Sequence, residues 1–206
     1  ATERTETVVV GAGQAGLATG YHLAKRHRPF VILDEQQRVG DNWRRHYDSL
    51  RLYSPARLDA LPGLAFPAPA FSFPTKDEMA DYLELYALTH ELPVRLRSRV
   101  SRVAADGEGF RVELDEPAER PITCDSVVVA TGTFGEQPNL PPFASDLAET
   151  VHQVHSSRYH GPGDLPAGPV LVVGASHSGL DIALELAAGR ETTLVGPVHG
   201  SVPLEW

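Results

Sequence analysis

A glycine-rich segment near the start of the sequence has the residue spacing of a pyrophosphate-binding loop. Gly11, Gly13 and Gly16 follow a β-branched run, and Asp34 stands 23 residues after Gly11. Glycine permits a tight turn and close approach of the backbone, while N–H groups of the following helix face the anion. An acid about 20 residues further on can bind the hydroxyl groups of a ribose. The pattern predicts a dinucleotide site, and the alternative is a structural turn without a ligand. The residues assigned to this first glycine loop and its acid are Gly11, Gly13, Gln14, Ala15, Gly16, Asp34 and, as a second acid, Glu35.

A second glycine-rich segment repeats the pattern 163 positions later, beginning at Gly174. Ser176 stands at its middle glycine position, and the next apolar run is followed by Gly196. That position holds neither an acid for an NAD ribose nor an arginine for the 2′-phosphate of NADP. We therefore expect a nicotinamide dinucleotide site with poor discrimination between NADH and NADPH, or else a structural turn. His177 either donates to a phosphate or caps the following helix. The residues assigned to this second glycine loop are Gly174, Ser176, His177, Ser178 and Gly179.

The residues around both loops predict alternating strands and helices. An apolar run precedes each loop, helical spacing follows it, and another short apolar run comes next, which is the order of a βαβ unit. Thr75 and Glu78 form a capping box before a further helix. Frequent prolines between Gly40 and Phe73 exclude a long helix there. Strands are expected at Thr7–Val10, Phe30–Leu33, Arg99–Ala104, Phe110–Leu114, Ser126–Ala130, Pro169–Val173 and Thr192–Val195, helices at 17–28, Lys76–Thr89 and Leu180–Ala188, and a hairpin turn at Asp106-Gly107.

Composition excludes several classes of protein. The 206 residues carry 18 Lys+Arg against 27 Asp+Glu, a net charge of −9, which argues against a nucleic-acid partner. No apolar run reaches the ~18–20 residues that span a bilayer, so we expect no membrane partner. Cys124 is the single cysteine and is expected to be a small buried hydrophobe; one thiol fits the cytoplasm and excludes a redox dithiol. His152, His155 and His160 lack the companions of a zinc site, so no metal ligand is assigned.

Four further motifs give the chain a family resemblance. They are Gly40-Asp41-Asn42-Trp43-Arg44-Arg45, Tyr47-Asp48-Ser49-Leu50-Arg51-Leu52, Phe73-Pro74-Thr75-Lys76-Asp77 and Ala130-Thr131-Gly132. In this order they resemble flavin-containing (class B) monooxygenases, most closely the short bacterial type. The resemblance implies an α/β, Rossmann-like flavoprotein with two dinucleotide-binding domains. FAD would occupy the first glycine loop, and NADPH, or alternatively NADH, the second.

The resemblance also implies roles for single residues and a domain boundary. Asn42 and Trp43 would contact the flavin side of FAD, and Arg44 is also assigned to cofactor binding. Trp43 alone could be an ordinary surface aromatic. Val100 would lie near the adenine, and Ala130, Thr131 and Gly132 would mark the crossing between domains. The predicted domains are 1–142 for FAD and 143–206 for NAD(P)H, with Pro138, Pro141 and Pro142 near the boundary.

The family mechanism needs little side-chain chemistry. NAD(P)H reduces FAD, reduced flavin captures molecular oxygen as a C4a-(hydro)peroxyflavin, and a small substrate with a nitrogen, sulfur or ketone group is oxygenated. The cofactor carries the reactivity, so no catalytic residue is assigned.

The family fingerprint FxGxxxHxxxY is half present in the chain. His155 and Tyr159 fit it, but Glu149 and Val151 stand where phenylalanine and glycine are expected. Family members return to the FAD domain after the second domain, so a chain ending at Trp206 is expected to be C-terminally truncated. The alternative function is a FAD-binding module or inactive fragment with at most NAD(P)H oxidase activity. A homo-oligomer is compatible with either function.

Overall fold

The computed structural model describes residues 3–115, 120–132 and 138–197, and these fall into two compact units. Residues up to 44 and from 51 to 132 form the first unit, and residues 45–50 and 138–197 form the second. Trp206, at which we expect truncation, lies outside the described residues. The boundary at 142/143 stays a prediction.

A parallel sheet forms the centre of the first unit. Its order is β4 (Val94–Arg95), β3 (Phe30–Leu33), β2 (Thr7–Val10) and β8 (Ser126–Val129). Along β2, Val8 points to one core and Val9 to another, because side chains of a strand alternate between the faces of a sheet. Both faces of the sheet are therefore covered, as is usual for parallel sheets.

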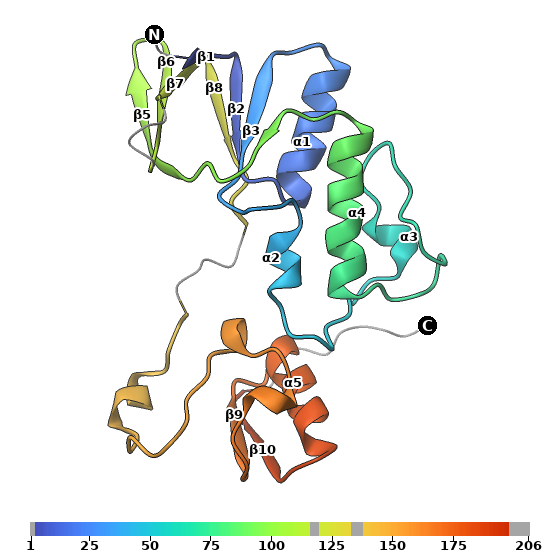
Figure 1. Cartoon of the computed structure of the whole chain (residues 1–206), viewed down its shortest axis with the longest axis vertical. Helices are drawn as coiled ribbons and strands as arrows, with labels where there is room; N and C mark the ends of the chain where they lie inside the picture. Colours follow the sequence, from blue (N-terminus) through green and yellow to red (C-terminus); the bar gives the residue numbers. More distant parts are fainter. Residues whose placement is uncertain (1–2, 116–119, 133–137, 198–206) are drawn as a thin grey trace. The chain divides into compact units, whose positions relative to one another are not determined.

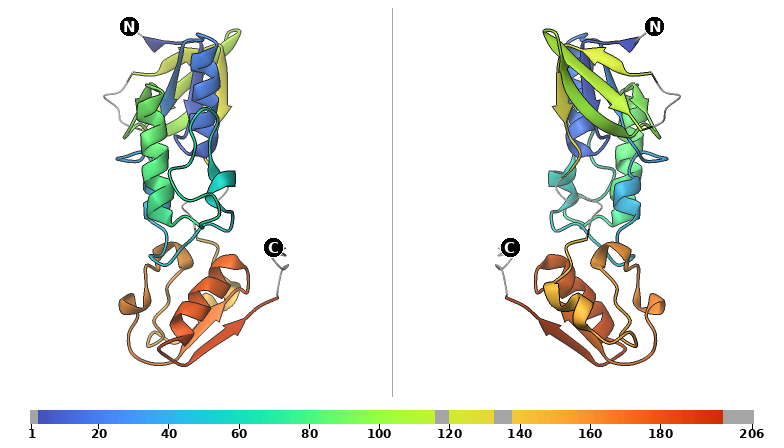
Figure 2. Two further views of the ribbon diagram at one scale, coloured as in Figure 1. Left: turned by 90° about the vertical axis from the view of Figure 1, so that its right-hand side faces the viewer. Right: turned by 90° about the vertical axis from the view of Figure 1, so that its left-hand side faces the viewer.

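Helices cover one face of this sheet (Figure 1). α1 (Gln14–Lys25) lies beside α4 (Lys76–Thr89), an arrangement that Figure 2 shows from two further sides. The capping box is confirmed, because Thr75 accepts from the Glu78 amide and Glu78 from the Thr75 amide. One side of α4 forms part of the core, because Met79, Tyr82, Leu83 and Tyr86 are buried. The proline-rich stretch contains only the short helices α2 (Asp41–Arg44) and α3 (Ala56–Asp59).

A second sheet covers the opposite face. Its order is β1 (Glu3–Arg4), β7 (Ile122–Cys124), β6 (Gly109–Leu114) and β5 (Val100–Asp106). Cys124 is buried as predicted, and burial raises the pKa of its thiol.

The hairpin between β5 and β6 is present, but the turn predicted at Asp106-Gly107 is displaced by one residue. Asp106 still pairs with Gly109, so the turn is Gly107-Glu108, with Gly107 in the left-handed region at a φ of +62°.

The second unit contains the parallel pair β9 (Val170–Val173) and β10 (Thr192–Val195), with α5 (His177–Ala187) packed on it. Three 3₁₀ turns, at Pro142–Asp146, Ser156–Arg158 and Pro162–Asp164, precede the strands. The predicted helix start at Leu180 is wrong, because the second half of the glycine loop already forms the first helical turn. The helix predicted at 17–28 also begins earlier, because α1 starts at Gln14, inside the first glycine loop. Among residues 3–115, 120–132 and 138–197, no helix is both long and apolar enough to span a bilayer.

Candidate dinucleotide sites

The backbone of the first glycine loop is fixed by close contacts that only glycine permits. Gly11 has a φ of +105°, and its amide donates to the Leu33 carbonyl at 2.7 Å. A Cβ at Gly11 would lie 2.4 Å from the Ala130 carbonyl oxygen, and one at Gly16 would lie 1.8 Å from the Gly11 oxygen. The end of β8 and the first turn of α1 therefore press against the loop, which places Ala130 beside it.

The N-terminus of α1 fits an anionic pyrophosphate. Gly13 is the N-cap residue and has no side chain to satisfy the first amides, and the first helical turn contains no acid. A Cβ at Gly13 would meet nothing within 4 Å, so open space lies beside the loop. Gln14 and Ala15 lie in that first turn. Free amides and the positive end of the helix dipole favour a negative group at this place.

The carboxylate of Asp34 is held against the first loop. One oxygen accepts from the Ala12 amide at 2.5 Å, and the other accepts from the Gln36 amide at 2.8 Å. Glu35 instead points to an exposed ion pair with Arg99 at 3.5 Å. The structure therefore separates the two candidate acids, with Asp34 at the loop and Glu35 away from it. The contribution of the Ala12 and Gln36 amides has no signal in the sequence.

Helix α2 brings Trp43 to the first loop. The Trp43 indole N–H donates to the Gln14 side chain at 3.3 Å, which joins two residues that were assigned separately from the sequence. Arg44 donates to Asp81 at 2.8 Å and to Glu84 at 3.2 Å on α4. Partial burial lowers the pKa of Arg44, but hydrogen bonds to its carboxylate partners outweigh this and raise it. Arg44 thus fixes α2 to α4. Asn42 is exposed on α2.

The remaining residues assigned to FAD lie at two strand ends. Val100 begins β5 and packs on the Val8 core, and the preceding Ser98 amide donates to the Asp34 carbonyl at 2.9 Å. Thr131 follows Ala130 at the first loop, with its Cα 3.4 Å from the Cβ position of Gly11. Gly132 is exposed and has a φ of +84°. Their contacts to a cofactor stay predictions.

The second glycine loop reproduces the backbone of the first. Gly174 has a φ of +110°, and its amide donates to the Val195 carbonyl at 2.7 Å. A Cβ at Gly179 would lie 1.7 Å from the Gly174 oxygen. Ser176 is the N-cap of α5, its side chain makes no capping bond within the described residues, and His177 and Ser178 lie in the first turn. Of the two roles considered for His177, the N-cap is therefore taken by Ser176.

The two loops differ where the following strand ends. In the first unit Val10 pairs with Leu33, and Asp34 comes next. In the second unit Val173 pairs with Val195 in the same way, and Gly196 comes next. Gly196 therefore stands where Asp34 stands in the first unit. A Cβ at Gly196 would come within 3.0 Å of the Ala175 amide nitrogen. This amide corresponds to the one that Asp34 binds in the first loop. The second loop thus has a glycine where the first has a carboxylate.

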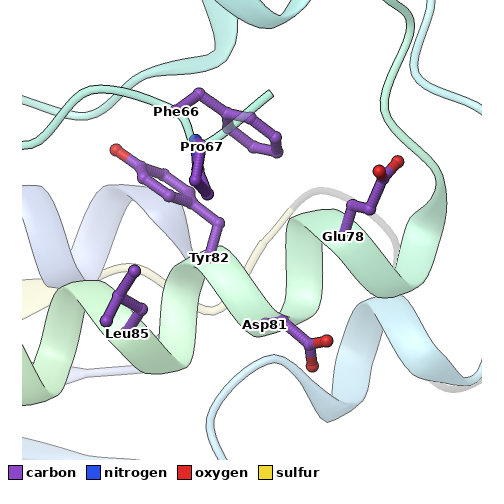
Figure 3. A pocket seen from close by; sticks show the side chains of 6 residues that line it. All are labelled: Phe66, Pro67, Glu78, Asp81, Tyr82 and Leu85. Carbon is purple, nitrogen blue, oxygen red and sulfur yellow. The ribbon is translucent and has the colours of Figure 1, made fainter. Parts of the chain in front are cut away.

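Two other features carry no assigned function. Within the described residues, no group of three or more His, Cys, Asp or Glu side chains could hold a metal, and His155 accepts from the Ser157 amide at the start of a 3₁₀ turn. A cavity of about 180 Å³ lies beside α4. Figure 3 shows the side chains that line it, which are Phe66, Pro67, Glu78, Asp81, Tyr82 and Leu85. Glu78 and Asp81 are already bound to the capping box and to Arg44.

Known proteins with the same sequence pattern are oxidoreductases. An uncharacterized CzcO-like oxidoreductase of Geobacillus kaustophilus is 45% identical over 201 residues, 97% of this chain and 57% of that protein. Rice indole-3-pyruvate monooxygenase YUCCA1 is 35% identical over 194 residues, 90% of this chain and 47% of that protein. A flavin-containing monooxygenase from Stenotrophomonas maltophilia superposes with a TM-score of 0.85 at 33% identity, covering 94% of this chain and 58% of that one. The chain spans about half the length of the curated relatives it matches.

The expected α/β dinucleotide-binding fold and the resemblance to flavin monooxygenases are confirmed by these similarities. A family described as "Pyridine nucleotide-disulphide oxidoreductase" matches residues 8–201. The 206 residues contain one cysteine, so they hold no redox dithiol, although the family is named after disulphide chemistry. The matched residues include both glycine loops, and the chain belongs to the pyridine nucleotide-disulphide oxidoreductase family.

Proposed function

We propose that this chain is the FAD- and NAD(P)H-binding part of a flavin-dependent monooxygenase. The substrate would be a small molecule with a nitrogen, sulfur or ketone group, and molecular oxygen would be the co-substrate. The observation that carries the proposal is the presence of two glycine loops with matching geometry, of which one has the ribose-binding acid. The similarity to two monooxygenases supports oxygenation over other redox reactions. The single cysteine favours a reducing compartment, the cytoplasm.

In this proposal the chain binds and orients, while bound FAD supplies hydride acceptance and oxygen activation. The first turn of α1 would hold the pyrophosphate through its amides. Asp34 would accept hydrogen bonds from the ribose hydroxyls. Each of its carboxylate oxygens can accept two hydrogen bonds, and the Ala12 amide uses one position on one oxygen while the Gln36 amide uses one on the other. Trp43 would lie along the cofactor, oriented by Gln14. The amides at the start of α5 would hold the nicotinamide dinucleotide, with no acid to exclude a 2′-phosphate.

The visible absorption spectrum of the purified protein tests this function. We expect a flavin band, which bleaches when NADPH is added under nitrogen and returns with oxygen. A band that persists would show FAD binding without hydride delivery. No band, even after incubation with FAD, would contradict the proposal.

A second candidate is a FAD-binding module without oxygenation. The observation favouring it is that Asp34 and the first turn of α1 fit a dinucleotide, whereas no described residue is assigned to an oxygenated substrate. Peroxide release during NADPH oxidation, without product from an offered amine, sulfide or ketone, would support this candidate. Stable incorporation of ¹⁸O from labelled oxygen into product would contradict it.

A further inference from the structure

One segment of ten residues is divided between the two units. Residues 41–44 are the helix α2 of the first unit, and residues 45–50 belong to the second unit. We call residues 41–50 the linking segment. Its two halves are anchored by different contacts, each within its own unit.

The first half of the linking segment is anchored to the helix of the first glycine loop. Trp43 donates to Gln14, the first residue of α1, at 3.3 Å. Arg44 binds the carboxylates of Asp81 and Glu84, and its carbonyl accepts from the buried Lys76 ammonium at 3.0 Å. These contacts hold α2 in one position.

The second half is anchored to the helix of the second glycine loop. Tyr47 is 2% exposed, and its hydroxyl donates to Asp181 on α5 at 2.9 Å. The Asp48 amide donates to the His160 carbonyl at 2.8 Å, and Leu50 packs on the core around Tyr47. Asp181 lies four residues after His177, where α5 begins.

The linking segment therefore joins the two loop helices by a short covalent path, since Trp43 and Tyr47 are four residues apart. We propose that Tyr47 and Asp181 are positioning residues through which binding at one glycine loop strengthens binding at the other. Because Trp43 is bonded to α1 and Tyr47 to α5, a ligand that restrains the start of one helix also restrains the chain that leads to the other. Coupling of this kind is reciprocal for the two ligands. It rests on the proposed function, because both dinucleotides must bind.

The second unit supplies a matched control. Tyr159 is 3% exposed, and its hydroxyl donates to Glu185 Oε2 at 2.6 Å, also on α5. Tyr47 and Tyr159 share one core and bond carboxylates four residues apart on one helix. Only Tyr47 lies on the linking segment. Tyr47→Phe and Tyr159→Phe each remove one hydroxyl, but only the first removes a hydrogen bond of the linking segment.

The test measures NADP⁺ binding to the protein by calorimetry, once with FAD bound and once after FAD is removed. We expect FAD to tighten NADP⁺ binding at least about fivefold in the unchanged protein. Tyr47→Phe should reduce this factor below twofold, whereas Tyr159→Phe should retain it. Asp181→Asn keeps an acceptor for the Tyr47 hydroxyl and should retain the coupling, while Asp181→Leu should lose it.

The outcomes separate this inference from the proposed function. If the unchanged protein binds both ligands but shows no coupling, or if both tyrosine variants lose it equally, the positioning role is overturned. If the unchanged protein binds neither FAD nor NADP⁺, the proposed function itself is overturned. Should Tyr47→Phe fail to fold, the pair Asp181→Asn and Asp181→Leu decides the question.

Discussion

The two glycine loops have nearly the same backbone, but their side chains differ, most clearly at the N-cap and after the following strand. The φ values of Gly11 and Gly174 are +105° and +110°, and both amides donate at 2.7 Å to the end of the next strand. The first loop has Gly13 at its N-cap and Asp34 beside it, whereas the second has Ser176 and Gly196. The comparison teaches that crowded glycines define the loop backbone, while the side chains beside it are free to differ.

The largest expected effect tests the shared part of the two loops. Gly16→Ala and Gly179→Ala would each place a Cβ within 1.8 Å or 1.7 Å of a backbone oxygen. Because a backbone carbonyl cannot move aside as a side chain can, we expect each to lower the free energy of unfolding by about 3 kcal/mol or more. Urea unfolding followed by circular dichroism measures this.

Gly13→Ala is the control for both, since a Cβ there meets nothing within 4 Å. It should cost no more than about 1 kcal/mol, the usual penalty of alanine at an N-cap. Equal losses in all three variants would show that crowding does not distinguish these glycines.

The next effect tests the acid that only the first loop has. Asp34→Ala leaves the Ala12 amide without its carboxylate partner, which costs about 1–3 kcal/mol when the group is buried. We expect FAD affinity to fall about tenfold or more, and NADPH affinity at the second loop to change little. Fluorescence titration with each cofactor measures both.

Glu35→Ala is the matched control, because Glu35 forms an ion pair with Arg99 and does not contact the first glycine loop through that pair. Its FAD affinity should stay within about twofold of the unchanged protein. A larger loss for Glu35→Ala than for Asp34→Ala would reverse the assignment of the ribose-binding acid.

A smaller effect tests the position that lacks an acid. With Gly196 after β10, we expect kcat/KM for NADH and NADPH to differ by less than about a hundredfold, ~2.7 kcal/mol. Steady-state oxidation of both coenzymes by one preparation gives the ratio. A stronger preference would mean that a contact outside residues 174–196 selects the coenzyme.

The smallest effect concerns the N-cap residues. Ser176→Gly and Gly13→Ser exchange the two caps, and serine and glycine differ at an N-cap by only a few tenths of a kcal/mol. Unfolding free energies should therefore change by less than about 0.5 kcal/mol. Thermal unfolding of both variants measures this, and a shift above about 1 kcal/mol would show that the cap residues, too, set the loop conformation.

Local patterns in the sequence predicted most of the elements that position both sites, although α1 and α5 begin earlier than expected. Strands Thr7–Val10, Phe30–Leu33 and Thr192–Val195 and helix Lys76–Thr89 have the predicted bounds. Apolar alternation, helical spacing and the capping box each involve residues only a few positions apart in the chain. They can therefore be recognised without knowledge of the fold. Strands β1, β4 and β7 were missed, because runs of two or three residues become strands only through their partners.

The sequence by itself determined that there are two glycine loops, each between a strand and a helix, and which one is followed by an acid. Only the tertiary structure decided that Asp34 rather than Glu35 binds the loop, that Ala130 closes on Gly11, and that Tyr47 is anchored in the second unit. The physical reason is the length of chain between partners. Tyr47 and Asp181 are 134 residues apart, and their contact follows from packing that no local spacing of residue types encodes. The spacing after Gly11 predicts an acid near the first loop, but only the fold shows which of two neighbouring acids meets the Ala12 amide.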